Sequence, residues 1–356
     1  MSMKDITIHS IFGDYKVVFD EQLSSLSSFL EDSTVVFIID EKVFKLYTQL
    51  FNTISPQRLI LIKANERNKS YLSMVKIYEI LTSFQAKRNL TLVGIGGGII
   101  QDISGFIAST LYRGIKWIYC PTTLLAQSDS CIGAKTSLNF GKYKNLIGTF
   151  YPPERVLLST KFLTTLSRKD FYSGMGEIVK LFLIDGENSL NYFKSQLSRN
   201  EIDLRNNIDE LLMRSLLIKK RYIEEDEFDK GIRNILNFGH CIGHAIESVT
   251  NYAIPHGQAV TLGMIWANII SESSQMLSNE KKEMIYNTFL KNNHTISEKL
   301  ISFDSGSIIS AMKKDKKRVG DDLAIILLSE NFKFNSKKDL KAEMITKTYD
   351  EFVSLL

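Results

Sequence analysis

The sequence predicts two domains: an α/β domain built on a parallel sheet, and an all-helical domain after it. Strand and helix patterns alternate through the first half of the chain, a rhythm typical of a Rossmann-like sheet. A run of glycines follows one apolar strand, and long amphipathic helical patterns then replace the strands. The 356 residues are too many for one small core. We therefore expect one domain over residues 1–170 and a second over residues 171–356.

The first domain opens on strand patterns. Residues 6–11 and 15–19 alternate as edge strands do. Residues 35–39 form a continuous β-branched and aromatic run, which indicates a parallel strand buried on both faces. Asp40 follows at the carboxyl end of that strand, where a dinucleotide-binding fold places the acidic residue that accepts from a ribose hydroxyl.

Three consecutive glycines close the next strand. A helical pattern over residues 70–87 leads to strand 92–98, which ends in Gly96–Gly98, and residues 117–120 form one more short strand. Glycines let a ligand approach the backbone, and the following helix offers free N–H groups to a pyrophosphate. Ile99 stands where G-x-G-x-x-G has its third glycine, so a tight turn without a ligand is the alternative.

The second half is predicted to be helical. Residues 208–226 and 260–277 carry long amphipathic patterns, and the prolines at 152–153 lie near the change from strands to helices. A charged run at 313–318 fits a solvated loop.

Composition narrows the class of protein. The net charge of +4 is small and its Lys and Arg residues are interspersed, which argues against a nucleic-acid partner. Three cysteines without C-x-x-C spacing argue against a disulfide framework and suit a reducing compartment. No run approaches the ~18 apolar residues of a membrane span. We expect a soluble, cytoplasmic protein.

Polar residues stand between apolar ones over residues 126–148. Asp129, Lys135, Lys144 and Asn145 suit a phosphorylated or polyhydroxylated substrate, which is held by charge and by directed hydrogen bonds. A surface loop with solvated lysines is the alternative.

Histidines cluster in the second half. The chain has five, and His240, His244 and His256 fall within a short span with glycines nearby, while Glu177 precedes them. A carboxylate with neutral imidazoles suits a catalytic divalent metal, most often zinc, and cobalt or iron would also fit. His240 and His244 share one helical face, so two interpretations are open: both bind metal, or one binds metal while the other meets substrate. Histidines with structural roles are the alternative.

These motifs together resemble the 3-dehydroquinate synthases and related sugar phosphate cyclases along most of the chain. The motifs that carry the resemblance, in chain order, are residues 96–102 (GGGIIQD), 112–114 (YRG), 121–129 (PTTLLAQSD), 133–136 (GAKT), 144–148 (KNLIG), 173–180 (SGMGEIVK), 233–244 (RNILNFGHCIGH), 256–260 (HGQAV) and 315–317 (DKK). The resemblance implies a Rossmann-like NAD-binding domain, a helical metal- and substrate-binding domain, NAD, one divalent metal and a homodimer.

The resemblance also implies site residues. As metal ligands it implies Glu177, His240 and His256. At the NAD site it implies Asp40, Glu66, Lys69, Gly97, Gly98, Ile99, Asp102, Thr122, Thr123, Leu125, Asp129, Lys144, Thr165 and Leu166. At the substrate it implies Arg113, Asp129, Lys135, Asn145, Lys180, Lys219, Arg233, Asn237, His244, Lys316 and Lys317. The last two would make the charged run part of the site.

Three positions depart from the family pattern. The family usually has glycine where Gln101 and Ala134 stand, and glutamate where Gln258 stands. Residues 139–141 are similar to some cyclases of secondary metabolism. None of these departures removes a residue that the resemblance implies is catalytic.

The activity implied is that of a carbon–oxygen lyase of the shikimate pathway, which serves aromatic amino acid biosynthesis. It converts 3-deoxy-arabino-heptulosonate 7-phosphate, a small sugar acid phosphate, into 3-dehydroquinate and phosphate, and NAD is regenerated in each cycle. Arg233 and Lys219 favour this keto acid, because a neutral sugar phosphate has no carboxylate for them to bind. An amino-dehydroquinate or cyclitol synthase, a metal-dependent polyol or glycerol-phosphate dehydrogenase, and an inactive homologue are the alternatives.

Overall fold

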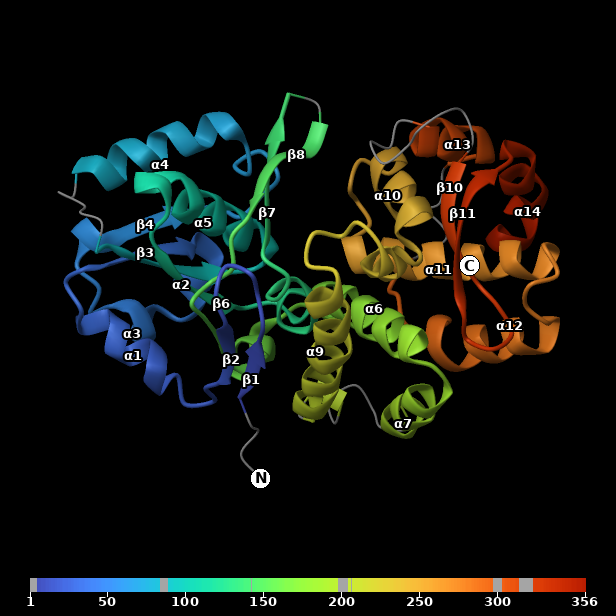
Figure 1. Cartoon of the computed structure of the whole chain (residues 1–356), viewed down its shortest axis with the longest axis horizontal. Helices are drawn as coiled ribbons and strands as arrows, with labels where there is room; N and C mark the ends of the chain where they lie inside the picture. The colour runs from blue at the N-terminus through green and yellow to red at the C-terminus, as the bar shows by residue number, and fades with distance from the viewer. Residues whose placement is uncertain are drawn as a thin grey trace. The chain divides into compact units, whose positions relative to one another are not determined.

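The chain forms two compact units. The computed structural model describes residues 5–83, 89–141, 143–197, 204–205, 207–296, 303–313 and 323–356 (Figure 1). The first unit comprises Met1–Leu166 with Lys220–Phe228, and the second comprises Ser167–Lys219 with Asp229–Leu356. None of the described helices is long and apolar enough to cross a membrane.

A mostly parallel sheet forms the centre of the first unit. Its described strands, in spatial order, are β1 (Ile6–Ile8), β2 (Tyr15–Phe19), β9 (Arg155–Leu158), β6 (Lys116–Pro121), β5 (Thr91–Gly96), β3 (Val35–Asp40) and β4 (Leu59–Ile62). Only the edge pair β1–β2 is antiparallel among these strands. The Rossmann-like sheet predicted from the sequence is confirmed.

Both faces of this sheet are covered. Figure 1 shows α4 (Tyr71–Ser83) and α5 (Gly98–Thr110) on one side and α1 (Ser24–Glu31) with α3 (Thr48–Phe51) on the other. The strand β3 is accordingly buried at every position before Asp40, which explains its unbroken apolar run.

The chain reverses its direction of winding across the sheet at β3. This strand pairs with β4 on one side and with β5 on the other. In open α/β sheets, such a switch point opens a crevice at the carboxyl ends of the strands, where ligands bind. Asp40 and the glycine run lie at this edge of the first unit.

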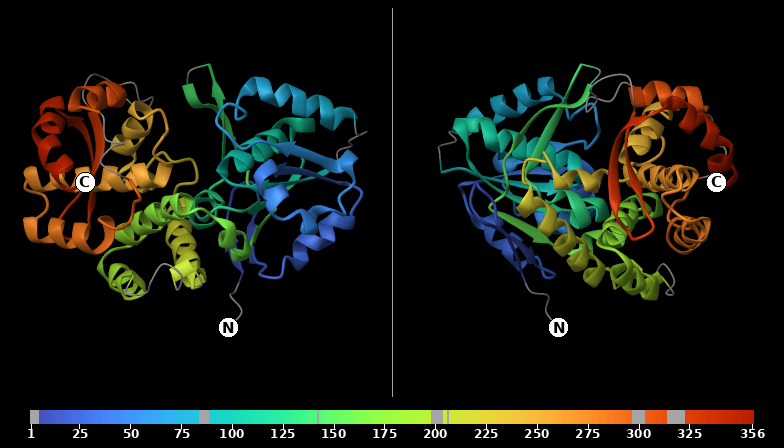
Figure 2. Two further views of the ribbon diagram at one scale, coloured as in Figure 1. Left: turned by 180° about the vertical axis from the view of Figure 1, so that it is seen from behind. Right: turned by 45° about the vertical axis from the view of Figure 1, so that its right-hand side comes forward.

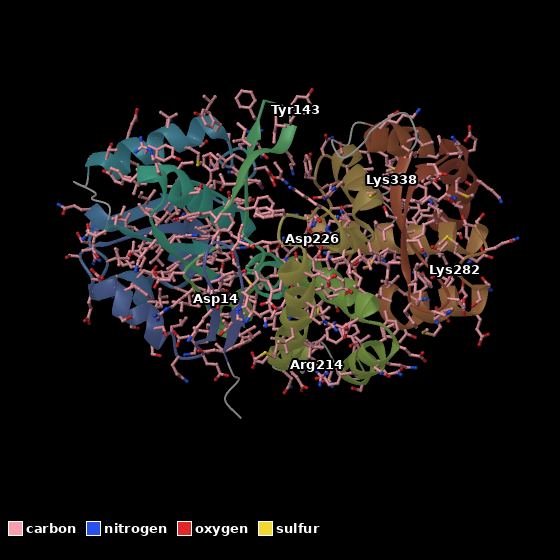
Figure 3. The ribbon with its side chains drawn as sticks, viewed as in Figure 1. Asp14, Tyr143, Arg214, Asp226, Lys282 and Lys338 are labelled. Atoms are coloured by element: carbon pink, nitrogen blue, oxygen red, sulfur yellow. The ribbon has the colours of Figure 1, made fainter. Side chains whose placement is uncertain are left out.

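An antiparallel hairpin that the sequence analysis did not predict adds to the first unit. Its strands are β7 (Lys135–Phe140) and β8 (Tyr143–Phe150), and β7 packs against α5. Tyr143 stands near the outer end of the hairpin (Figure 3).

The end of α9 (Ile208–Glu225) returns to the first unit. Glu224 Oε1 accepts from the backbone N–H of His9 at 2.7 Å, and the Glu227 carboxylate accepts from Ser10 Oγ at 2.5 Å. The Phe228 ring centroid lies 5.0 Å from that of Phe150 and 6.3 Å from that of Phe12. A segment distant in sequence therefore completes the first unit.

The second unit is helical, as predicted, with one two-stranded sheet that was not predicted. Its described elements besides α9 are α6 (Arg168–Asp185), α7 (Glu187–Leu197), the short helix η5 (Ile232–Asn237), α10 (His240–Val249), α11 (His256–Ser273), α12 (Asn279–Ile285), the short helix η6 (Tyr286–Leu290), α13 (Ser305–Lys313), β10 (Leu323–Leu328), β11 (Phe334–Leu340) and α14 (Ala342–Ser354). Figures 1 and 2 show α11 running through the middle of the unit, with α6, α10 and α14 packed around it. Its residues from Gly257 to Ser271 are all buried.

Glycines let α11 touch two neighbouring helices backbone to backbone. A Cβ on Gly257 would lie 1.7 Å from the carbonyl oxygen of Ser173 in α6. A Cβ on Gly263 would lie 2.0 Å from the carbonyl oxygen of Gly239, which precedes α10. The Gly257 N–H also donates to Ser173 Oγ at 3.1 Å. These close contacts fix the first turns of α11 beside α6 and α10.

Candidate metal centre and cofactor site

Four side chains of the second unit meet where α6, α10 and α11 approach. His240 is the first residue of α10, His256 is the first residue of α11, and Glu177 lies one turn after Ser173 in α6. His244 lies one turn after His240, on the same face of α10. The glycine contacts of α11 therefore bring the predicted ligands together.

The donor atoms point at one another. Glu177 Oε1 lies 3.5 Å from His240 Nε2 and 3.4 Å from His256 Nε2. The ligand atoms of His240, His244 and His256 all lie within 4.8 Å of one another. His244 is the exposed member of the four, which leaves it accessible to a substrate.

Lys180 determines much of the electrostatics of this cluster. Glu177 and Lys180 are 1% and 2% exposed, and Lys180 Nζ donates to Glu177 Oε2. Burial alone would raise the pKa of Glu177, but Lys180 and the two nearest histidines outweigh it and hold that pKa well below its usual value. Burial and the Lys180 ammonium hold the pKa of His240 well below its usual range, which keeps the imidazole in its metal-binding form.

His256 has a second carboxylate beside it. Its Nδ1 lies 3.0 Å from Oε2 of Glu247, which the sequence analysis missed. Burial alone would lower the pKa of His256, but Glu247 and then Glu177 raise it to about 10. A signal was present in the sequence, because Glu247 stands seven residues after His240 and so shares its helical face.

The cluster fits a divalent metal. Glu177 Oε1 is buried, and no group of the described residues makes a well-formed hydrogen bond to it, which is costly for a carboxylate oxygen unless a cation binds there. Two atoms that each lie about 2.0–2.2 Å from a tetrahedral zinc ion are about 3.3–3.6 Å apart. The separations of Glu177 Oε1 from the two Nε2 atoms fall in that range.

Predicted NAD-binding residues of the first unit lie along the carboxyl edge of the sheet. Asp40 ends β3, Gly97 and Gly98 follow β5, and Thr122 follows β6, where its N–H donates to Gly96 O at 3.0 Å. The N-cap of α5 is Gly97, which has no side chain to bond the first N–H groups of the helix, so these groups can face a pyrophosphate. Asp40 also has a structural role, because its carboxylate accepts from Lys42 N and caps α2 (Glu41–Leu46).

The glycine run is required by packing as well. A Cβ on Gly96 would lie 2.4 Å from Ile100 Cγ1, whereas one on Gly98 would meet, among the described residues, Ser130 Oγ alone, at 3.8 Å. The first glycine therefore lets α5 approach β5, and the last leaves space beside the helix N-terminus. Predicted neighbours at this edge are half-buried Ile99, Thr123 and Leu125. The hydroxyl groups of Thr165 and Tyr47 are hydrogen-bonded at 2.9 Å, and Leu166 is the last residue of the first of the two segments that form this unit.

A polar network joins five further predicted residues. Lys69 Nζ donates to Asp102 Oδ2 at 2.6 Å, and Lys144 Nζ lies 3.2 Å from Glu66 Oε1. Two residues that were not predicted connect these pairs. Ser137 N donates to Asp102 Oδ1 and Ser137 Oγ to Asn145 Oδ1, and Asn139 Nδ2 donates to Glu66 Oε2. The hairpin strand β7 thus links the network.

Replacing Lys69 by methionine should destabilise the first unit. The Asp102 carboxylate would lose its buried counterion, at a cost of about 3–5 kcal/mol in the free energy of unfolding. Urea denaturation would measure this cost. The double variant Lys69→Met/Asp102→Asn should recover part of it, since no uncompensated charge remains; equal stability of the single and double variants would contradict the prediction.

The predicted substrate residues are spread over both units. In the first unit, Arg113 is exposed, Asp129 lies in the helical turn Ala126–Ser130, and Lys135 begins β7. In the second unit, Lys219 and Arg233 are buried, and Asn237 Nδ2 donates to Asn234 O at 3.0 Å. Lys316 and Lys317 lie outside the described residues.

Comparison with known proteins identifies the family. The family model described as 3-dehydroquinate synthase N-terminal matches residues 59–173, and the one described as 3-dehydroquinate synthase C-terminal matches residues 174–318. This chain belongs to the 3-dehydroquinate synthase family. A 3-dehydroquinate synthase of Clostridium tetani is 35% identical, covering 99% of this chain and 96% of that protein. One of Clostridium perfringens is 37% identical, covering 76% and 77% respectively.

Solved structures share the fold of this family member. A 2-deoxy-scyllo-inosose synthase, solved with carbaglucose-6-phosphate, NAD+ and Co2+, is 26% identical with a TM-score of 0.85, covering 98% of this chain and all of that chain. A 2-epi-5-epi-valiolone synthase from Streptomyces hygroscopicus is 21% identical with a TM-score of 0.80, covering 96% and 97%, and shows the fold alone.

Two departures from the 3-dehydroquinate synthase pattern have local explanations. Ala134 has a φ of 62°, a left-handed conformation in which glycine is preferred. Gln101 and Ser130 form a reciprocal pair, in which Gln101 Nε2 donates to Ser130 O at 2.5 Å and Ser130 Oγ donates to Gln101 Oε1 at 2.6 Å. Gln101 therefore ties α5 to the turn that carries Asp129.

The third departure, Gln258, forms hydrogen bonds through both the nitrogen and the oxygen of its side-chain amide. The side chain is fully buried, and its Nε2 donates to Lys169 O at 2.7 Å. Its Oε1 accepts from Thr295 N at 2.9 Å. A carboxylate has no N–H to donate to Lys169 O, so this chain is built around glutamine at this position.

Replacing Gln258 by glutamate should lower the free energy of unfolding by about 1–3 kcal/mol at pH 7, because a buried carboxylate would face Lys169 O. This contact and burial would raise the pKa of the new carboxyl above its unfolded value of about 4.3. The loss should therefore be absent below that pH and grow as the pH rises through the folded pKa. Thermal unfolding at several pH values measures it. The exposed control Gln275→Glu should show no such trend, and a pH-independent loss at Gln258 would refute this explanation.

Proposed function

We propose that this chain is a 3-dehydroquinate synthase that converts 3-deoxy-arabino-heptulosonate 7-phosphate into 3-dehydroquinate and phosphate. The enzyme uses NAD and one divalent metal ion. Membership of the family over nearly the full chain supports the reaction. The observation that carries the proposal is the buried Glu177 oxygen between two imidazole nitrogens, because a redox-neutral cyclase of this family needs a Lewis acid at its hydroxyl.

The choice of a keto acid rests on two buried cations. Lys219 and Arg233 are 6% and 4% exposed, and both belong to the second unit. An ammonium and a guanidinium both bind anions, and a guanidinium binds a carboxylate with two parallel hydrogen bonds. We assign them to the substrate carboxylate, which the neutral sugar phosphates of other cyclases lack.

We assign the metal to Glu177, His240 and His256. When bound, the metal supplies a Lewis acid for the hydroxyl being oxidised, and NAD supplies the hydride acceptor. Lys180 holds the Glu177 carboxylate in place through its ion pair. Lys180 or Asp129 orients the reacting hydroxyl and assists its proton transfer.

The remaining residues bind the cofactor and the leaving phosphate. We assign Arg113, Lys135, Asn237, His244 and a lysine of 316–317 to the phosphate, since cations and amide donors recognise its oxygens. Asn145 is assigned to the substrate. Asp40 accepts from a ribose hydroxyl and Gly97–Gly98 receive the pyrophosphate of NAD. The rest of the NAD contacts are assigned to Glu66, Lys69, Ile99, Asp102, Thr122, Thr123, Leu125, Asp129, Lys144, Thr165 and Leu166.

The proposal also covers the native metal, the oligomeric state, the compartment and the domain roles. The native metal is zinc or cobalt, the active form is a homodimer, and the enzyme works in the cytoplasm within the shikimate pathway. The three free cysteines are compatible with a reducing compartment. Residues 1–170 serve as the NAD-binding domain and residues 171–356 as the metal- and substrate-binding domain.

The test is a reaction of the metal-loaded protein with 3-deoxy-arabino-heptulosonate 7-phosphate and catalytic NAD. Phosphate and the carbocyclic product are both measured, together with absorbance of NADH. We expect release of phosphate, formation of 3-dehydroquinate and no net NADH, because the hydride is returned in each cycle.

Two other outcomes would reject the proposal. Release of phosphate only from a neutral heptulose or hexose phosphate would indicate another sugar phosphate cyclase. Net production of NADH from a polyol or glycerol phosphate would indicate a dehydrogenase.

A further inference from the structure

Glu247 lies on the face of α10 that carries His240 and His244. It follows His244 by three residues, so its side chain lies one turn further along the helix. Its carboxylate is 12% exposed and lies 3.0 Å from Nδ1 of His256, through Oε2. Glu247 thus touches a proposed metal ligand.

The two ligand histidines are held in the same way by different groups. His240 Nδ1 lies 3.2 Å from the backbone carbonyl oxygen of Phe238, and His256 Nδ1 lies beside the Glu247 carboxylate. An acceptor at Nδ1 favours the tautomer with the proton on that nitrogen, which leaves the Nε2 lone pair for a metal. In both rings, Nε2 is the atom that faces Glu177 Oε1.

The difference between the two acceptors is charge. The backbone carbonyl that orients His240 is uncharged, whereas Glu247 places a second carboxylate beside the cluster. The negative charge of that carboxylate makes the His256 imidazole a better donor to a cation. His256 begins α11, and its Nδ1 contact comes from Glu247 of α10, so a neighbouring helix orients this ring.

We propose that Glu247 is a positioning residue that fixes the ring orientation and tautomer of His256 and thereby strengthens metal binding. This inference rests on the proposed function, in which His256 is a metal ligand. Glu247 acts through its contact with the His256 ring.

The test is a titration of the full-length protein, stripped of metal, with Co2+. Dissociation constants come from competition with a chelator, and the absorption spectrum of bound Co2+ reports the ligand geometry. Glu247→Ala should weaken binding about 10- to 100-fold and change the spectrum. Glu247→Gln keeps an acceptor for the Nδ1 proton, so it should keep the wild-type spectrum and lose less than about tenfold.

Controls separate this role from general damage. Glu343→Gln, an exposed carboxylate in the first turn of α14, should bind Co2+ as the wild type does. Thermal unfolding of each metal-free variant verifies its fold, and Glu247→Met replaces the alanine variant if that one does not fold.

The inference is overturned if the alanine or methionine variant binds Co2+ as tightly as the wild type. It is also overturned if the glutamine variant loses as much affinity as alanine. Failure of the wild type to bind Co2+ is a different result, because it would reject the metal centre of the proposed function itself.

Discussion

Replacing His240 by alanine is expected to abolish metal binding and turnover while leaving the fold intact. The variant loses an imidazole whose Nε2 lies 3.5 Å from Glu177 Oε1. Loss of a direct ligand should cost more than the 10- to 100-fold typical of its supporting groups, so we expect affinity to fall by more than about 100-fold. His240 is the first residue of α10 and is only partly buried, so its truncation leaves a small cavity.

Metal content and turnover should be measured on the same preparations. Chelation should remove the activity of the wild type and added metal should restore it, whereas added metal should not rescue His240→Ala. His9→Ala is the matched control, because His9 is 66% exposed and pairs with Asp14 in the first unit. Turnover of His240→Ala at the wild-type rate would show that His240 is not a metal ligand.

Replacing Gly257 by alanine should disrupt the second unit. Its new methyl group would lie 1.7 Å from Ser173 O, and a backbone carbonyl cannot rotate away as a flexible side chain does. Helices α6 and α11 would have to separate, at a cost above about 3 kcal/mol in the free energy of unfolding. Because Glu177 and His256 are on these helices, metal affinity should fall as well.

Chemical denaturation and Co2+ binding would measure both effects. Gly306→Ala is the control, since among the described residues beyond the local backbone its Cβ would meet Asp304 Oδ1 at an ordinary 3.4 Å, and helix α13 should tolerate alanine there. A Gly257→Ala protein with wild-type stability and affinity would show that the contact between α6 and α11 is not what places the ligands.

The sequence predicts those helices and strands whose burial produces a regular pattern of apolar residues. The strand at 35–39 reads as one apolar run because helices cover both faces of its sheet. The hairpin strands β7 and β8 are half exposed and mix polar with apolar residues, so pairing rather than burial creates them. β10 has an apolar run, Leu-Ala-Ile-Ile-Leu-Leu, that could have been read as a strand, but its partner β11 is mostly polar.

The candidate site likewise contains residues that the sequence predicts and contacts that it does not. Histidines are rare in this chain, so the spacing of His240, His244 and His256 is informative by itself. The contacts between the NAD-site residues could not be predicted from spacing, because Lys69 and Asp102 are 33 residues apart and meet only once the sheet has formed. Ser137 and Asn139 were missed for that reason, since a polar residue on an exposed strand carries no signal of its contacts.

The return of α9 to the first unit has a consequence for synthesis of the chain. Phe228, which packs against Phe12 and Phe150, follows Leu166 by 62 residues. At roughly 5–20 residues per second, a ribosome needs about 3 to 12 s to make that stretch. During this time the nascent sheet domain lacks the segment that covers Phe150 and binds the backbone of His9. The two units therefore mature together, and a fragment ending at residue 166 would expose this apolar surface to aggregation.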